Sequence, residues 1–134
     1  MKSTTRYISD YVYEGTNENG NKVLVDMRQA VEKENQSPVE LLLSALASCV
    51  AVEIALIIKK KRKTLTDLVI ETDATRKPTH PKSLTDIHHK YILTSPDVKE
   101  EELSKMIRLI LDNYCSVADS LKANITYSVE VKVA

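Results

Sequence analysis

One segment dominates the hydrophobic pattern of the chain. Residues 41–58 are almost wholly apolar, and a basic cluster at 59–63 follows them. The sequence SPVE at 37–40 supplies a serine N-cap, a proline at the first helical position and a glutamate at the third, which is a capping box. This pattern predicts a helix of about 22 residues, roughly 33 Å long at 1.5 Å per residue.

Segments of alternating or β-branched residues predict strands before and after this helix. The Asn-Gly pair within residues 16–21 predicts a turn between the first two strands. Residues 28–36 are polar and predict a loop. We expect strands at 4–13, 22–27, 65–76, 87–94 and 124–133, and further helices at 96–113 and 115–122. This order, ββ–α–ββ–αα–β without an internal repeat, predicts one α+β domain over residues 1–134.

The long apolar helix has the length of a membrane span, and its basic flank would suit one. Against that interpretation, Ser44, Ser48, Cys49 and Glu53 lie inside the helix, and no second span follows. A helix that is apolar on all sides is also typical of one buried by a sheet on one side and a partner subunit on the other. We expect the second arrangement and no membrane partner.

The charge of the chain bears on which kinds of partner it can bind. The 19 basic and 19 acidic side chains balance, so nothing suggests a nucleic-acid partner. The cluster at 59–63 is interpreted as a solvated last helical turn that complements the helix dipole, rather than as a phosphate-binding patch. The N-terminal residues contain no apolar signal-peptide core, so we expect a cytoplasmic protein. In a reducing compartment the two cysteines are buried thiols, metal ligands or redox catalysts rather than a structural disulfide.

The two cysteines stand in different local settings. Cys49 lies in the middle of the apolar helix, where an unreactive core thiol is the ordinary interpretation. Cys115 follows a helix break and lies near the N-terminus of the next helix, where free N–H groups and the dipole favour a thiolate. Residue types alone therefore leave both an inert and a redox role open.

A metal site is the third interpretation of these cysteines, together with His80, His88 and His89. No C-x-x-C or H-x-x-x-H spacing is present. The adjacent His88 and His89 would point to opposite faces of a strand. We expect neither a metal nor a cofactor.

Several motifs together resemble the OsmC/Ohr family. The run SPVELLLSALASC at 37–49 is similar to the helix of that family, which opens with proline and glutamate and reaches a reactive cysteine three turns later. RKPTHP at 76–81, the strand around Ile87 and NYCSV at 113–117 are similar to the second half of the family, where a second cysteine opens the last helix. The resemblance covers roughly residues 20–134.

The resemblance implies an intertwined homodimer, with antiparallel sheets packed around a long central helix and active sites built from both subunits. It also implies a thiol-dependent peroxidase of oxidative-stress defence that prefers organic hydroperoxides. Cys49 would be the peroxidatic thiolate, which becomes a sulfenic acid, and Cys115 would resolve it as a disulfide. A dithiol reductant, a lipoylated protein in some relatives, would restore both thiols.

Three further residues enter as supporting candidates. Family members stabilise the reactive thiolate with an arginine, and Arg28 is the candidate here. That arginine contacts a glutamate directly after the proline, where this chain has Val39. Glu40 lies about 100° further round the helix and is expected to close the capping box. Glu53 shares the helical face of Cys49 and would need a cation as partner.

A rival from another class is a binding protein that keeps the OsmC scaffold without its chemistry. Such a protein would hold an apolar small molecule or sense oxidants through its thiols. Val39 in place of the family's glutamate favours this rival, whereas the presence of both cysteines favours the enzyme.

Overall fold

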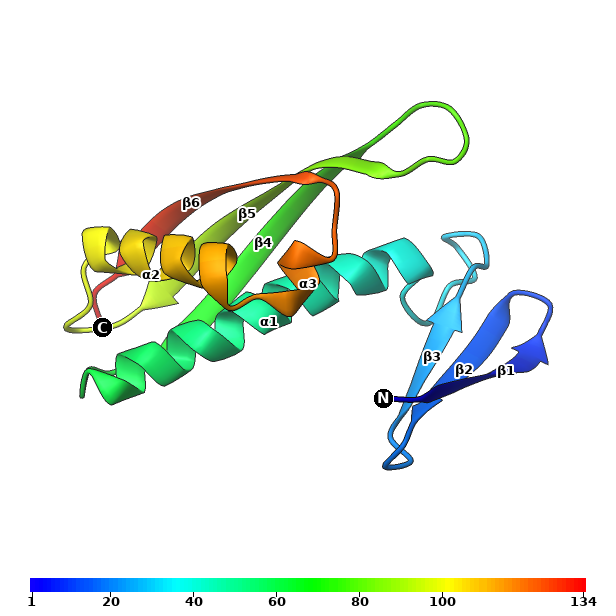
Figure 1. The fold of residues 1–134 in the computed structure, drawn as a ribbon, viewed down its shortest axis with the longest axis horizontal. Helices are drawn as coiled ribbons and strands as arrows, with labels where there is room; N and C mark the ends of the chain where they lie inside the picture. Colours follow the sequence, from blue (N-terminus) through cyan, green and yellow to red (C-terminus); the bar gives the residue numbers. More distant parts are fainter. The chain divides into compact units, whose positions relative to one another are not determined.

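The computed structural model describes residues 1–134, which form two compact units, Met1–Ser44 and Ala45–Ala134. The first unit contains a three-stranded antiparallel sheet in the order β1-β2-β3 (Figure 1). Its strands are β1 (Ser3–Ser9), β2 (Val12–Asn17) and β3 (Lys22–Asp26). Only Val12 and Asp26 are buried in this unit's sheet, so the sheet has almost no core of its own.

The prediction of one strand over residues 4–13 was wrong, because the chain reverses at Asp10 and Tyr11. The Tyr7 hydroxyl donates to the Asp10 carboxylate at 2.9 Å across this reversal. Aspartate favours turns, and the β-branched and aromatic residues around it conceal that signal. The turn predicted within 16–21 is confirmed, with Gly20 at a φ of 85°.

The long helix is confirmed as α1 (Pro38–Lys60). Its capping box is reciprocal: the Glu40 N–H donates to Ser37 Oγ at 3.3 Å, and the Ser37 N–H donates to Glu40 Oε1 at 3.0 Å. Along its length one stripe at a spacing of four residues is buried, comprising Leu46, Val50, Ile54 and Ile58. By length and composition α1 is the one helix that meets the requirements for a membrane span.

The second unit contains a sheet in the order β4-β5-β6 and two further helices. Its elements are β4 (Asp67–Arg76), β5 (Leu84–Thr94), α2 (Glu100–Asn113), α3 (Ser116–Asp119) and β6 (Asn124–Lys132). β4 and β5 are antiparallel, but β6 runs parallel to β5, which differs from the antiparallel arrangement we expected. The connection through α2 and α3 is long enough for a crossover, and a parallel neighbour requires one.

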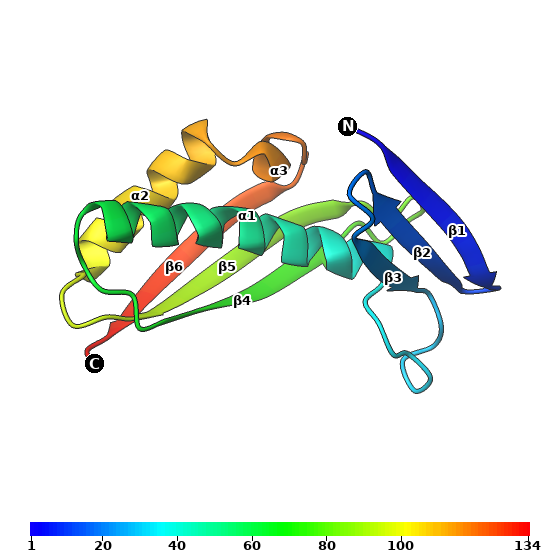
Figure 2. The same ribbon diagram turned by 90° about the horizontal axis from the view of Figure 1, so that it is seen from below.

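One face of this sheet carries the core of the second unit. Figures 1 and 2 show α1 and α2 along the same face of β4, β5 and β6. The residues of β5 alternate as predicted for the histidine pair: His88 is exposed and His89 is fully buried. The buried residues of β5 are Ile87, His89, Tyr91 and Leu93, and those of α2 are Leu103, Met106, Ile107 and Ile110.

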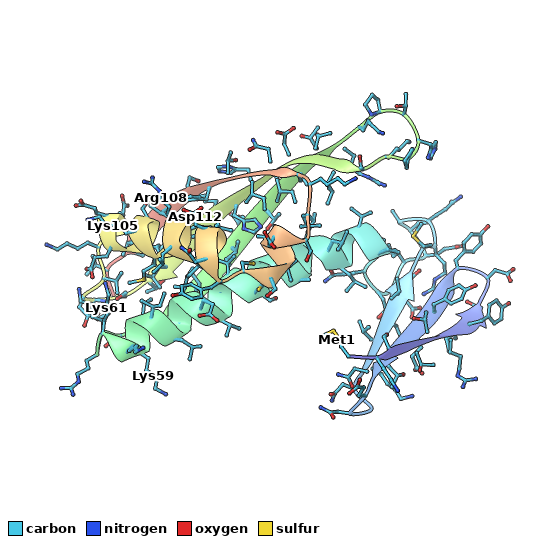
Figure 3. The ribbon with its side chains drawn as sticks, viewed as in Figure 1. Met1, Lys59, Lys61, Lys105, Arg108 and Asp112 are labelled. Carbon is cyan, nitrogen blue, oxygen red and sulfur yellow. The ribbon has the colours of Figure 1, made fainter.

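The side of α1 opposite its buried stripe is exposed within the chain. It carries Val52 and Leu56, which are 57% and 55% exposed, together with Ala45. These three residues, which we call the outer stripe, lie at spacings of seven and four residues and so share one side of the helix. By contrast, the exposed side of α2 carries the charged side chains of Lys105, Arg108 and Asp112 (Figure 3). The outer stripe is therefore an apolar helix face without a partner in the second unit.

Candidate functional site

Cys49 lies on α1 at the border between the buried stripe and the outer stripe. It is half-buried and is a free thiol. At about 100° per residue, it lies about 60° round the helix from Leu46 and Val52 alike. A side chain in this position reaches both the core and the exposed face.

Cys115 is the N-cap residue of α3 and is buried. Its Sγ accepts a hydrogen bond from the Ala118 N–H at 3.4 Å. The Ile110 carbonyl at the end of α2 accepts from the backbone N–H groups of both Tyr114 and Cys115. These bonds end α2 and turn the chain so that the thiol of Cys115 faces inward.

In the second unit the Cys49 side chain lies close enough to Cys115 to act on the pKa of its thiol. Burial raises the pKa of the Cys115 thiol, the Ala118 N–H acts in the opposite direction, and the hydrogen bond and charge of the Cys49 side chain raise it further. As predicted, N–H groups at this helix N-terminus, those of Ala118 and Val117, lower the pKa of Cys115, but burial outweighs them and the net shift is upward. A helix of four residues offers a weak dipole, and desolvation is the larger effect.

Arg28 lies in the first unit, where Asp26 holds its guanidinium. Arg28 Nε donates to Asp26 Oδ1 at 3.0 Å and Nη2 donates to Oδ2 at 2.7 Å. The fully buried carboxylate also accepts the backbone N–H groups of Arg28, Glu34 and Asn35. The Arg28 hydrogen bonds hold the pKa of Asp26 far below its ordinary range, against the effect of burial.

Asp26 was missed by sequence reasoning. The available signal was an acidic residue at the end of a strand, two positions before an arginine and at the start of a polar loop. Such a carboxylate can collect the backbone N–H groups of the loop as well as the arginine. A cavity of about 340 Å³ lies beside this pair, lined by Tyr11, Met27, Arg28, Gln29 and Glu32.

The other α1 residues named from the sequence are Glu40, Val39 and Glu53. Glu40 closes the capping box as expected and also pairs with Lys33. Val39 is half-buried on the first turn of α1. Glu53 is half-buried, and no cation of the second unit pairs with it. A cavity of about 290 Å³ opens at Cys115, lined by Asp112, Asn113, Tyr114, Cys115, Ser116 and Asp119.

Comparison with known proteins places these features in a family. The family model described as OsmC-like protein matches residues 31–130. Protein YhfA of Escherichia coli K12 is 28% identical over 136 residues, which cover 100% of both chains. α1 and both cysteines lie inside the matched range.

Solved structures share the fold over nearly the whole chain. A crystal structure of a hypothetical protein from Aquifex aeolicus has a TM-score of 0.86 and 27% identity, covering 99% of this chain and 96% of that one. The organic hydroperoxide resistance protein OhrB of Bacillus subtilis has a TM-score of 0.63 and 14% identity, covering 98% of both chains. The long apolar helix, the two sheets and the match over residues 31–130 together show that this chain belongs to the OsmC-like protein family.

Proposed function

We propose that this protein is a thiol-dependent hydroperoxide reductase of oxidative-stress defence, with Cys49 as the peroxidatic and Cys115 as the resolving cysteine. The observation that carries the proposal is the interaction of the two thiols in the second unit. A sulfenic acid formed on Cys49 has a second thiol next to it, which is what disulfide formation requires. The OsmC/Ohr family includes peroxidases, and OhrB bears organic hydroperoxide resistance in its name.

The states of the two thiols fit these roles. Burial raises the pKa of Cys115, so it stays protonated at neutral pH and does not compete for the hydroperoxide. Cys49 is the more exposed of the two and is the one that a substrate can approach. Cys49 is thus accessible as the nucleophile, and Cys115 remains a protonated thiol until it attacks oxidised Cys49.

Arg28 is the proposed source of positive charge for the Cys49 thiolate. In family members a glutamate of the helix contacts this arginine, and here Val39 stands in that position. We propose that Asp26 supplies the carboxylate instead, from the end of β3, and holds the guanidinium in one direction. The apolar side chains of Tyr11 and Met27 in the neighbouring cavity suit the organic part of a hydroperoxide.

The proposed working form is a homodimer. The sheet of the first unit has almost no core, and the outer stripe of α1 has no partner in its own unit. Exposed apolar surfaces of this kind are typical of protein interfaces. Cys49 borders the outer stripe, so a second copy there would also enclose the reactive thiol. The proposed location is the cytoplasm, where dithiol reductants are available.

The test is turnover of cumene hydroperoxide with dithiothreitol or dihydrolipoamide as reductant. We expect Cys49→Ser to abolish the rate. Cys115→Ser should allow one turnover and then accumulate sulfinic acid on Cys49, measured by intact-protein mass spectrometry. Ser116→Ala, beside Cys115 but without a thiol, is the matched control and should keep full activity.

Two results would contradict the proposal. One is the absence of turnover of cumene and fatty-acid hydroperoxides with either dithiol. The other is an unchanged rate in Cys49→Ser. If the protein lacks turnover but binds an apolar small molecule stoichiometrically, the scaffold-only binding protein is the correct alternative.

A further inference from the structure

The cavity of about 290 Å³ in the second unit opens where α2 ends and α3 begins. Its wall includes Cys115, which is only 3% exposed, together with the side chains of Asp112 on α2 and Asp119 on α3. The volume is close to that of small-molecule sites, which begin near 300 Å³. The cavity is therefore a route from solvent to the buried residue that carries the second thiol.

Two carboxylates give this cavity a negative charge. Asp112 and Asp119 are both exposed, and neither forms an ion pair within the chain. Arg108 lies one turn before Asp112 on α2 (Figure 3), but it does not line the cavity. A molecule that enters the cavity therefore meets two unpaired negative charges, which favour a cation and disfavour an anion.

The disulfide of the proposed cycle offers two sulfur atoms to a reductant, those of Cys49 and Cys115. Thiol–disulfide exchange is faster when the departing thiol has a low pKa. Burial raises the pKa of Cys115, which makes Cys115 a poor leaving group. An attack at Cys115 avoids this disadvantage, because Cys49 then departs instead. Cys49 also borders the outer stripe, which a second copy would cover, whereas no residue of the cavity belongs to that stripe.

We propose that this cavity is the reductant site: a thiol reductant without an anionic group, and best with an ammonium group, enters beside Asp112 and Asp119 and attacks the sulfur of Cys115. This inference rests on the proposed function for the disulfide and names the chemical class of its reductant.

The exchange is balanced by the reductant alone. Its thiolate forms an S–S bond with Cys115 while the bond between Cys115 and Cys49 breaks, and Cys49 leaves as a thiolate. A second thiolate of the reductant then attacks the reductant's own sulfur in the mixed disulfide. Cys115 departs and takes a proton from the solvent. The reductant is thereby oxidised by two electrons to a disulfide, and both protein cysteines are restored.

The test uses protein oxidised with diamide, so that no hydroperoxide is involved. Reduction of the disulfide is followed by intact-protein mass spectrometry with two monothiols. Cysteamine carries an ammonium group, and 3-mercaptopropionate carries a carboxylate. We expect the double variant Asp112→Asn/Asp119→Asn to lower the ratio of the cysteamine rate constant to the 3-mercaptopropionate rate constant about tenfold, because it removes both charges. Differences in intrinsic thiol reactivity cancel when this ratio is compared between proteins.

The matched control is the double variant Asp67→Asn/Asp73→Asn. Both aspartates are exposed on β4, form no ion pair and do not line the cavity, so the change in net charge is the same. We expect this control to leave the ratio of the two rate constants unchanged. Ser116 lines the cavity without a charge, so Ser116→Ala should leave the ratio unchanged as well. An equal change in both double variants, or a change in neither, overturns the inference.

A measurement on the unaltered protein locates the attacked sulfur. The reaction with cysteamine is quenched with N-ethylmaleimide, and the modified cysteines are identified by peptide mass spectrometry. We expect cysteamine on Cys115 and maleimide on Cys49, and the reverse pattern overturns the inference. If diamide forms no disulfide between the two cysteines, the proposed function fails at its resolving step and the inference fails with it. A disulfide that forms but is reduced without a charge preference contradicts the inference alone.

Discussion

Arg28 reaches the buried carboxylate of Asp26 through two parallel hydrogen bonds of 3.0 and 2.7 Å. Three backbone N–H groups complete the five donors on this one side chain. The loop after β3 is thereby tied to the strand that precedes it. A charged pair with planar, two-point geometry fixes direction as well as distance.

Removal of the Asp26 charge should loosen the whole loop. We expect Asp26→Asn to lower the melting temperature more than Arg28→Lys, because the asparagine leaves several backbone donors and the guanidinium without their acceptor. Differential scanning calorimetry of the two variants measures this. Equal losses in both variants would contradict a central role for Asp26.

The depressed pKa of Asp26 also predicts a pH dependence. A group whose folded-state pKa lies below its unfolded value of about 3.9 contributes its full stability above that pH. This contribution is lost progressively as the pH falls from about 4 toward the folded-state pKa. The expected difference in urea midpoint between the unaltered protein and Asp26→Asn is therefore constant from pH 7 to pH 5 and shrinks below pH 4.

The lowered pKa of His89 predicts a second loss of stability as the pH falls, which begins near pH 6.5, above the range in which Asp26 acts. Its pKa falls from 6.5 in a free side chain to about 4 in the folded protein because of burial and the charge of His88. The unfolded chain therefore binds a proton between pH 6.5 and 4 that the folded chain does not. At 1.36 kcal/mol per unit, this costs about 3 kcal/mol at pH 4. Urea unfolding of the unaltered protein should show the slope, and His89→Leu should remove it.

The capping box predicts different outcomes for two changes of Glu40. Glu40→Gln keeps an acceptor for the Ser37 N–H and should change stability little. Glu40→Ala loses that acceptor. Ser37→Ala loses the other half of the box and should lower the free energy of unfolding by about 1 kcal/mol. If Glu40 acts only as a cap, Glu40→Gln retains full peroxidase activity. A large loss of activity in a stable Glu40→Gln protein would instead give this glutamate a role in the reaction.

The outer stripe of α1 predicts the effect of a charge on assembly. In the proposed homodimer, Val52→Glu or Leu56→Glu buries an unpaired carboxylate and should raise the dimer dissociation constant by about 100-fold or more. Sedimentation velocity over a range of concentrations measures this change. Leu109→Glu is the control, because Leu109 is 46% exposed on α2 and follows the exposed Arg108 in the sequence. If the glutamate substitutions on α1 and α2 change the dimer dissociation constant equally, or if neither changes it, the outer stripe is not the interface.

Local signals in the sequence predicted α1 and its cap well. The SPVE motif and the apolar run are local signals, so they can be recognised in the sequence before the helix packs on its sheet. The split of residues 4–13 into two strands was missed because a single aspartate at a turn carries little weight against the seven β-branched and aromatic residues around it. The parallel pairing of β6 depends on the path of α2 and α3, which residue patterns do not report.

For the two cysteines, too, the sequence determined some properties and the tertiary structure determined others. By itself the sequence determined that one thiol lies inside the apolar helix and the other at a helix break, and this order of motifs led to the correct family. Only the tertiary structure decided that the two thiols interact, and that Cys115 is harder to ionise than its helix end suggests. Burial and contacts between distant segments set a pKa, and neither is encoded in the residues next to the thiol. The same reason hides Asp26, whose loop partners become neighbours through folding.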